Sequence, residues 1–175
     1  MRTLIVLLFV LALTAVVGFA QELKPTVELR SEYLMTVEAP LDPPQLVGAR
    51  RIVNVPAGGT VRGPRINGTI VAPAGDWLYP MPDGSSRLDV RFTIKTDDNE
   101  LILVEYGGVM VLSKDAAERL GKGEAITHAD AYFLTAPRFT TASAKYAWLN
   151  HIQAVGKMVS LQRGRGIKYD IFEMR

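Results

Sequence analysis

Residues 51–77 read RIVNVPAGGTVRGPRINGTIVAPAGDW, and this stretch decides the fold. It holds five glycines and three prolines, and both residue types destabilise the interior of a helix. Two candidate strands, 45–54 and 59–71, lie in or beside it. Glycine at this density marks strands that bend, bulge or approach another backbone closely. The stretch ends on Asp76 and Trp77, which put a carboxylate beside a large aromatic ring where the chain is expected to turn.

The rest of the chain also has the two-residue periodicity of strands. The clearest case is 87–96, where apolar and polar side chains alternate strictly. A turn at 97–99 joins it to a second strand, 100–111, as a hairpin. Further strands are predicted at 25–37, 130–139, 146–162 (with a bend at Gly156) and 167–174, and loops at 39–44 and 73–86. The one helical segment is 114–120, which Gly121 would end.

These segments predict an all-β protein with eight to ten strands and at most one short helix. Such a chain folds as a sandwich or as a barrel. We favour a single compact antiparallel β-barrel, because closure removes exposed strand edges. The glycine-rich early strands also suit tight curvature.

The composition excludes several classes of function. The chain of 175 residues has 20 basic and 18 acidic residues and no cysteine, so thiol catalysis and metal–thiolate sites are excluded. The two histidines lack the spacing of a metal site, and we expect neither metal nor cofactor. The only basic cluster is Arg163, Arg165 and Lys168 beside a turn, so we expect no nucleic acid partner. The oligomeric state does not follow from the sequence.

Residues 1–20 have the pattern of a secretory signal peptide. A basic residue precedes an apolar run over 4–17, and small residues lead to an expected cleavage after Ala20. The alternative is an uncleaved anchor, but the run is shorter than the ~20 residues of a membrane-spanning helix. We therefore expect a periplasmic or secreted protein of one domain, 21–175, with no membrane span after cleavage.

Five blocks of sequence resemble the domain-of-unknown-function 3237 family, also called uncharacterised protein family 0311. They are Gly63-Pro64; Asp76-Trp77; Leu88 to Arg91; Tyr132-Phe133 with Pro137 and Phe139; and Tyr146 with Trp148-Leu149-Asn150. The resemblance covers about residues 27–174. It implies a small β-barrel, but it implies no activity and no catalytic residues.

Two carboxylates are candidates for acid–base chemistry. Asp76, beside Trp77, could have a raised pKa at a barrel mouth, or it could only cap a turn. Glu105 interrupts the apolar strand LILVEYGG. If its side chain points inward it must be paired or protonated, and pairing with an arginine is the structural alternative.

Six further residues are candidates for ligand binding, and each has a structural alternative. If its side chain points inward, Arg91 could bind an anionic oxygen with Asp89 as its partner; outward, both are solvated charges. Arg138 is a second anion contact or a surface charge. The aromatic candidates could line a pocket or fill the core, and the amide could orient a ligand or tie strands together. These last candidates are Trp77, Tyr132, Trp148 and Asn150.

Three functions remain open from the sequence. The first is a barrel that binds a small molecule, aromatic or bearing a carboxylate. The second is a cofactor-free lyase, isomerase or hydrolase in which Asp76 or Glu105 moves a proton and Arg91 stabilises an anion. The third is an envelope or interaction protein whose barrel is filled by side chains.

Overall fold

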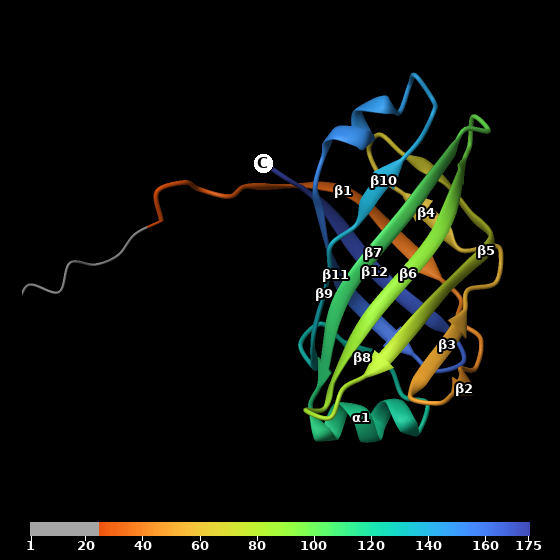
Figure 1. Ribbon diagram of the computed structural model, residues 1–175, viewed down its shortest axis with the longest axis vertical. Helices are drawn as coiled ribbons and strands as arrows, with labels where there is room; N and C mark the ends of the chain where they lie inside the picture. The colour runs from red at the N-terminus through yellow and green to blue at the C-terminus, as the bar shows by residue number, and fades with distance from the viewer. Residues whose placement is uncertain (1–24) are drawn as a thin grey trace, which may run out of the picture.

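The computed structural model describes residues 25–175, and its strands form one antiparallel sheet that closes on itself (Figure 1). The predicted signal peptide lies outside the described residues. Eight strands make the ring, each bonded to the next and the last to the first. In ring order they are β1 (Ser31–Ala39), β4 (Thr60–Arg62), β5 (Asn67–Pro80), β6 (Ser85–Thr96), β7 (Leu101–Leu112), β9 (Ala131–Thr135), β11 (Ala154–Gln162) and β12 (Gly166–Met174). The prediction of an all-β barrel is confirmed.

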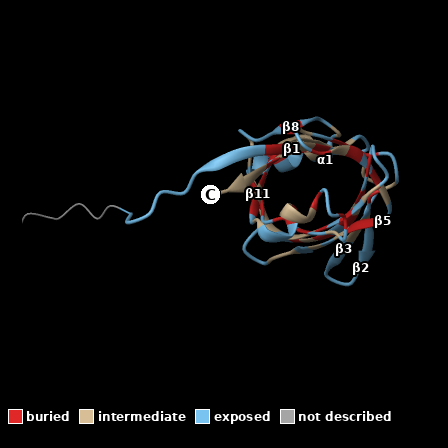
Figure 2. Cartoon of the chain, turned by 90° about the horizontal axis from the view of Figure 1, so that it is seen from above, coloured by how far each residue is buried: buried red, intermediate tan, exposed pale blue. Residues whose placement is uncertain are grey.

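Buried and exposed side chains alternate along the strands, so one face of each strand points into the barrel. In β6 the buried apolar side chains are Leu88, Val90, Phe92 and Ile94, and the residues between them face solvent or are half-buried. Figure 2 looks along the barrel axis and shows the buried residues following the ring of strands. Burial of these apolar side chains supplies the main stabilisation, because the chain has no cysteine and so no disulfide.

The remaining elements extend the barrel or cover its ends. β2 (Gln45–Val47) and β3 (Arg50–Asn54) form a hairpin attached to the second half of β5. β8 (Ile126–Thr127) pairs with β11, and β10 (Arg138–Thr140) pairs with β7. Helix α1 (Lys114–Gly121) lies at one end of the barrel, and the 3₁₀ helix η1 (Ala147–His151) lies at the other (Figure 1).

Helix α1 forms where the sequence predicts it, but it ends later. The Ser113 side chain caps its start by accepting a hydrogen bond from the Ala116 N–H at 3.1 Å. Gly121 was predicted to end the helix, yet it is the last helical residue. The residue with the left-handed backbone is Gly123, with φ of +83°. No helix within residues 25–175 is both long and apolar enough to span a membrane.

The loop predicted at 73–86 is wrong. Most of it belongs to β5 and β6, and only 81–84 forms the turn between them. The β5–β6 register shifts between Val71 and Gly75, and this irregularity accommodates Pro73 inside the strand. Asp83 fixes the turn by accepting hydrogen bonds from the N–H and the hydroxyl of Ser85.

Several predicted strands were too long, because turn signals inside them were overlooked. Segment 45–54 is the β2–β3 hairpin, with Gly48 at φ of +57° in its turn. Segment 59–71 is likewise divided, between β4 and β5, and 130–139 is divided at Pro137. Segment 146–162 begins as η1 and becomes β11 only at Ala154, and segment 25–37 becomes strand only at Ser31.

β11 pairs with β12 continuously from Ala154 to Met158, and the register of this pair shifts between Met158 and Ser160, beyond the predicted bend at Gly156. Gly156 instead allows a close approach between strands. A Cβ atom at this position would lie 2.4 Å from the Thr135 Oγ1 atom.

Candidate ligand cavity inside the barrel

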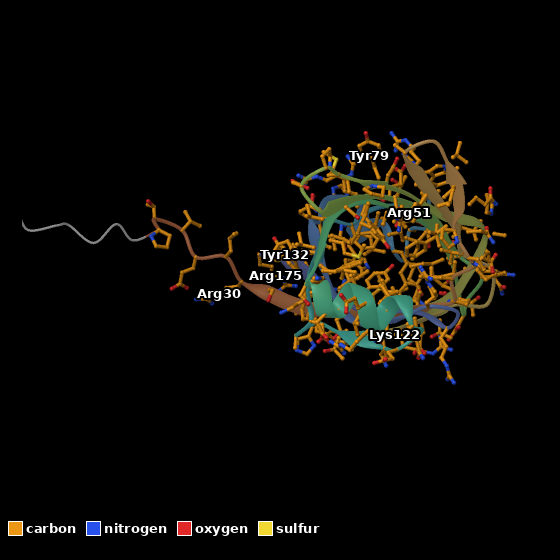
Figure 3. The ribbon with its side chains drawn as sticks, turned by 90° about the horizontal axis from the view of Figure 1, so that it is seen from below. Arg30, Arg51, Tyr79, Lys122, Tyr132 and Arg175 are labelled. Atoms are coloured by element: carbon orange, nitrogen blue, oxygen red, sulfur yellow. The ribbon has the colours of Figure 1, made fainter. Side chains whose placement is uncertain are left out.

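A cavity of about 150 Å³ lies inside the half of the barrel nearer α1. We call it the barrel cavity. Its walls are apolar side chains from seven strands or their flanks, among them Leu88, Phe92, Met110, Phe133 and Ile167. Val53 of β3, Val55 just after β3, and Leu41 complete the wall. Figure 3 looks at this end of the barrel, where α1 covers part of the opening. Among the described residues, only three polar side chains line the cavity: Asp76, Tyr106 and Tyr169.

The strand register points Asp76 into this cavity. Asp76 pairs with Val53 of β3 on one side and with Val90 of β6 on the other, and both valines also line the cavity. Its Oδ1 atom accepts a hydrogen bond from the Asp89 N–H at 3.1 Å. The β5–β6 register stops at the Asp76–Val90 pair and resumes at Tyr79. The carboxylate therefore takes a backbone donor at the place where the ladder is interrupted.

The position of Asp76 changes its acidity. Burial raises the pKa of Asp76 from 3.8 to about 6, because the charged form loses water. The hydrogen bond from the Asp89 N–H lowers this pKa in part, and the negative charge of Asp89 raises it again. A carboxyl group with a pKa near 6 can release and accept a proton at neutral pH. That is the property required of a general acid or base.

Two tyrosines form a hydrogen-bonded pair in the same cavity. The Tyr106 hydroxyl donates to the Tyr169 hydroxyl oxygen at 3.1 Å, and the two rings meet edge-on with centroids 6.1 Å apart. Tyr106 also packs edge-on against Phe92. Burial raises the pKa of both tyrosines, and the charge of Asp76 raises them further. Both hydroxyls therefore stay protonated near neutral pH, in the same cavity as the Asp76 carboxyl group.

The direction of this bond matters for binding. Because Tyr169 accepts from Tyr106, its own proton remains available to a ligand. The bond from Tyr106 opposes the effect of burial by lowering the pKa of Tyr169. Tyr169 is thereby made the better donor of the two, as in any chain of hydrogen bonds that polarise one another.

The structure places Arg91 and Glu105 outside the barrel, as the structural alternatives predicted. The Arg91 guanidinium lies 3.0 Å from Asp89 and 3.3 Å from Glu105, and it lies 5.8 Å from the centre of the Trp77 ring. All three charged side chains are at least one-third exposed. Four of the predicted residues thus form one exposed cluster on the outer face of β5, β6 and β7, away from the barrel cavity.

The other predicted binding residues also lie outside the cavity. Tyr132 is 58% exposed on the outer surface (Figure 3), and Arg138 is exposed on β10. Trp148 is half-buried in η1, with the Arg65 guanidinium 3.4 Å from the centre of its ring. Asn150 bonds the N–H and the carbonyl of Thr141, so its amide ties two segments together.

Sequence reasoning overlooked the two cavity tyrosines, although strand parity places each of them on the same face as apolar residues of its strand. Tyr106 lies two residues from Val104 and four from Ile102, so all three share the inward face of β7. Tyr169 likewise shares the inward face of β12 with Ile171. Glu105 stood out as the unusual residue of its strand, but the same parity puts it on the outer face.

The described residues bring together no cluster that would hold a metal ion. Within 25–175, no three side chains of His, Cys, Asp or Glu converge. His128 and His151 are both exposed.

The chain is similar to proteins from several bacteria. It is 32% identical over 131 residues to a UPF0311 protein from Clostridium acetobutylicum, a match that covers 71% of this chain and 83% of that protein. A conserved protein of unknown function from Rhodopseudomonas palustris has a crystal structure with a TM-score of 0.78 and 26% identity, and the match covers 86% of this chain and all of that one.

A more distant neighbour shares the fold alone. It is an enzyme from Penicillium herquei, with a TM-score of 0.61 and 20% identity over 87% of this chain and 98% of that one. Residues 29–174 match the family model described as a protein of unknown function, DUF3237. The chain belongs to the DUF3237 family.

Proposed function

We propose that the protein binds a small, largely apolar molecule in the barrel cavity. One observation carries the proposal: a cavity with apolar walls holds three polar side chains, Asp76, Tyr106 and Tyr169. Binding sites for small molecules usually combine apolar walls with a few polar groups that fix orientation. An engineered protein cavity of ~150 Å³ holds one benzene molecule, so the cavity of about 150 Å³ suits a ligand with a single ring.

The lining also narrows the charge of the ligand. None of the described residues that line the cavity is Lys or Arg. A carboxylate ligand would therefore meet Asp76 with no cation to offset the repulsion. We favour a neutral ligand with an oxygen atom that can accept a hydrogen bond from Tyr169.

A barrel filled only for stability fits the lining less well. The largest fully buried side chains include Met35, Ile66, Ile94 and Ile102, which fill the core with apolar groups. A carboxylate among the apolar side chains that line the barrel cavity lowers stability, and an apolar residue of similar size would avoid this cost. Side chains that a protein retains at a cost in stability are commonly those needed for function.

Calorimetric titration with phenol and with benzene tests the binding proposal. We expect both to bind and phenol to bind more tightly, because its oxygen can bond Tyr169. Val90→Phe would place a ring in the cavity and weaken both ligands at least tenfold. Val111→Phe is the matched control, since Val111 is 42% exposed on β7. If neither ligand binds, or if Val90→Phe binds as the wild type does while still folded by thermal unfolding, the cavity is not the site.

A second candidate function is acid–base catalysis at the same place. The pKa of Asp76, raised to about 6 by burial, favours it. An enzyme from Penicillium herquei has the same fold, so the fold is compatible with catalysis. The arginine that the sequence suggested for stabilising an anion lies outside the barrel. The tyrosine pair would have to take that role.

We further propose that the protein is exported and that its first 20 residues are removed. The apolar run over 4–17 and the small residues before Gln21 support this. Amino-terminal sequencing of the protein recovered from the producing cell is the test. A chain that begins at Gln21 is expected, and a chain that retains the apolar run would contradict cleavage.

A further inference from the structure

Two polar groups of the cavity have complementary roles toward a ligand, one as a proton acceptor and one as a hydrogen-bond donor. Asp76 supplies a carboxylate on β5, and Tyr169 supplies a hydroxyl proton on β12. The rest of the lining is apolar except for Tyr106, which donates to Tyr169 at 3.1 Å. A ring-sized molecule in this cavity would thus meet one proton acceptor and one hydrogen-bond donor, with water largely displaced.

We propose that the barrel cavity catalyses a proton shift between two carbon atoms of a small, neutral, cyclic ketone, with Asp76 as the base and Tyr169 as the donor to the ketone oxygen. The proposal rests on the binding function above. It assigns Asp76 and Tyr169 as catalytic residues and Tyr106 as a positioning residue that acts through Tyr169.

The reaction needs no co-reactant. In a β,γ-unsaturated ketone, Asp76 removes a proton from the carbon between the carbonyl and the double bond. The electrons of that C–H bond form a new carbon–carbon double bond to the carbonyl carbon, and the C=O π electrons move to the oxygen. Tyr169 donates to the resulting enolate oxygen. The protonated Asp76 then returns its proton to the γ carbon, which yields the conjugated ketone and restores both side chains.

Physical reasons favour this chemistry over a reaction of charged substrates. Charge develops on one oxygen during the step, and donors held in place in an apolar site stabilise such charge strongly. Tyr106 strengthens the Tyr169 donor because it lowers the pKa of Tyr169. Asp76, with a pKa of about 6, is ionised at neutral pH and still basic enough to accept a proton. An ordinary aspartate would be a weaker base.

The test follows the ultraviolet absorbance of the conjugated product when the protein is given a β,γ-unsaturated cyclohexenone. We expect catalysis that rises with pH through about 6 as Asp76 ionises. Asp76→Asn should reduce kcat/KM by at least ~100-fold, and Tyr169→Phe by about 10- to 100-fold. Asp97→Asn is the control, because Asp97 is exposed and far from the cavity lining.

The role of Tyr106 needs a spectroscopic measurement. Para-nitrophenol changes colour when it ionises, so its bound spectrum reports how strongly the site stabilises an oxyanion. We expect the wild type to increase the ionised fraction, Tyr169→Phe to abolish the increase, and Tyr106→Phe to reduce it. A Tyr106→Phe variant that lowers stability but leaves this fraction unchanged would make Tyr106 merely structural and overturn its assignment.

Binding and catalysis fail in distinguishable ways. If cyclohexanone binds by calorimetry but the unsaturated ketone is not isomerised above the rate in buffer, the catalytic inference is overturned and the binding function stands. If no ring compound binds, both are overturned. Isomerisation that survives Asp76→Asn also overturns the assignment of the base.

Discussion

Replacing Asp76 by Asn should stabilise the protein at neutral pH, and the effect should disappear in acid. Asn keeps the size of the side chain and can still accept the hydrogen bond from the Asp89 N–H. It removes the charge that burial makes unfavourable. The folded state of the wild type binds the Asp76 proton more tightly than the unfolded state does, because the pKa is about 6 when folded and 3.8 as the ordinary value.

The sign and size follow from proton linkage. A group whose pKa is raised by folding adds stability at low pH, and this contribution is lost as the pH rises through the folded pKa. The difference between 3.8 and about 6 corresponds to about 3 kcal/mol in full, at ~1.36 kcal/mol for each pH unit. Between about pH 7.5 and about pH 4.5 the wild type should therefore gain ~2 kcal/mol from this group. The Asn variant should gain none.

Urea unfolding of both proteins across this range is the assay. We expect the advantage of Asp76→Asn over the wild type to shrink by ~2 kcal/mol between about pH 7.5 and pH 4.5. The other carboxylates titrate in both proteins, so they cancel in the difference. Asp97→Asn serves as the matched control, because Asp97 is exposed and should show no such trend. A difference that does not change with pH, or a variant less stable by ~1 kcal/mol at pH 7.5, would refute the account of Asp76 as a carboxylate held at a cost.

Three other predictions concern the barrel itself. Gly156→Ala should destabilise the fold by ~1–3 kcal/mol in urea unfolding, because its Cβ would lie 2.4 Å from the Thr135 Oγ1 atom; no measurable loss would contradict this. Ser113→Ala should lower the free energy of unfolding by ~1 kcal/mol, because it removes the cap of α1. Ser113→Thr should retain most of the stability that the cap provides. Hydrogen bonds from Lys145 and from two hydroxyl groups hold the pKa of Asp98 well below its usual range. The stability that the Asp98 carboxylate contributes is therefore present at neutral pH and is lost as the pH falls below about 4. Asp98→Asn should weaken that acid dependence in thermal unfolding, and an unchanged acid limb would refute it.

The sequence predicted the fold class more successfully than it predicted where the individual strands and helices begin and end. Period-two alternation and glycine density indicate a β-barrel, because both are local consequences of strands packed on one side. The turns were harder, since Pro73 looks like a loop signal but sits at a register shift that only the pairing with β6 reveals. The helical turn η1 was likewise hidden, because its residues 147–151 carry no strong helix signal and are held by Leu149, which is fully buried.

The site could be predicted only in part. Asp76 was identified because a carboxylate beside Trp77 is locally unusual. Glu105 was suggested because it interrupts an apolar strand, and Arg91 because its face could have pointed inward, yet both lie on the outer face, where they pair at 3.3 Å. Alternation separates the two faces of a strand, but it does not say which face points inward until the partner strands are known. Tyr169 therefore gave no signal by itself, because its significance comes from Tyr106 on a different strand.

Two neighbouring sequence blocks on which the resemblance to the family rests, Asp76-Trp77 and Leu88 to Arg91, meet in the structure at one hydrogen bond. The Asp89 N–H donates to the Asp76 carboxylate at 3.1 Å, while the Asp89 side chain points outward to Arg91 at 3.0 Å. Asp89 therefore acts on Asp76 in two opposite ways, since its N–H lowers the pKa and its charge raises it. We expect Arg91 to offset part of that charge from outside the barrel, because its guanidinium lies 3.0 Å from the Asp89 carboxylate. Arg91 then has an indirect role, because its replacement by Met should raise the pKa of Asp76 further and move the pH dependence of Asp76 upward, without any contact between Arg91 and a ligand.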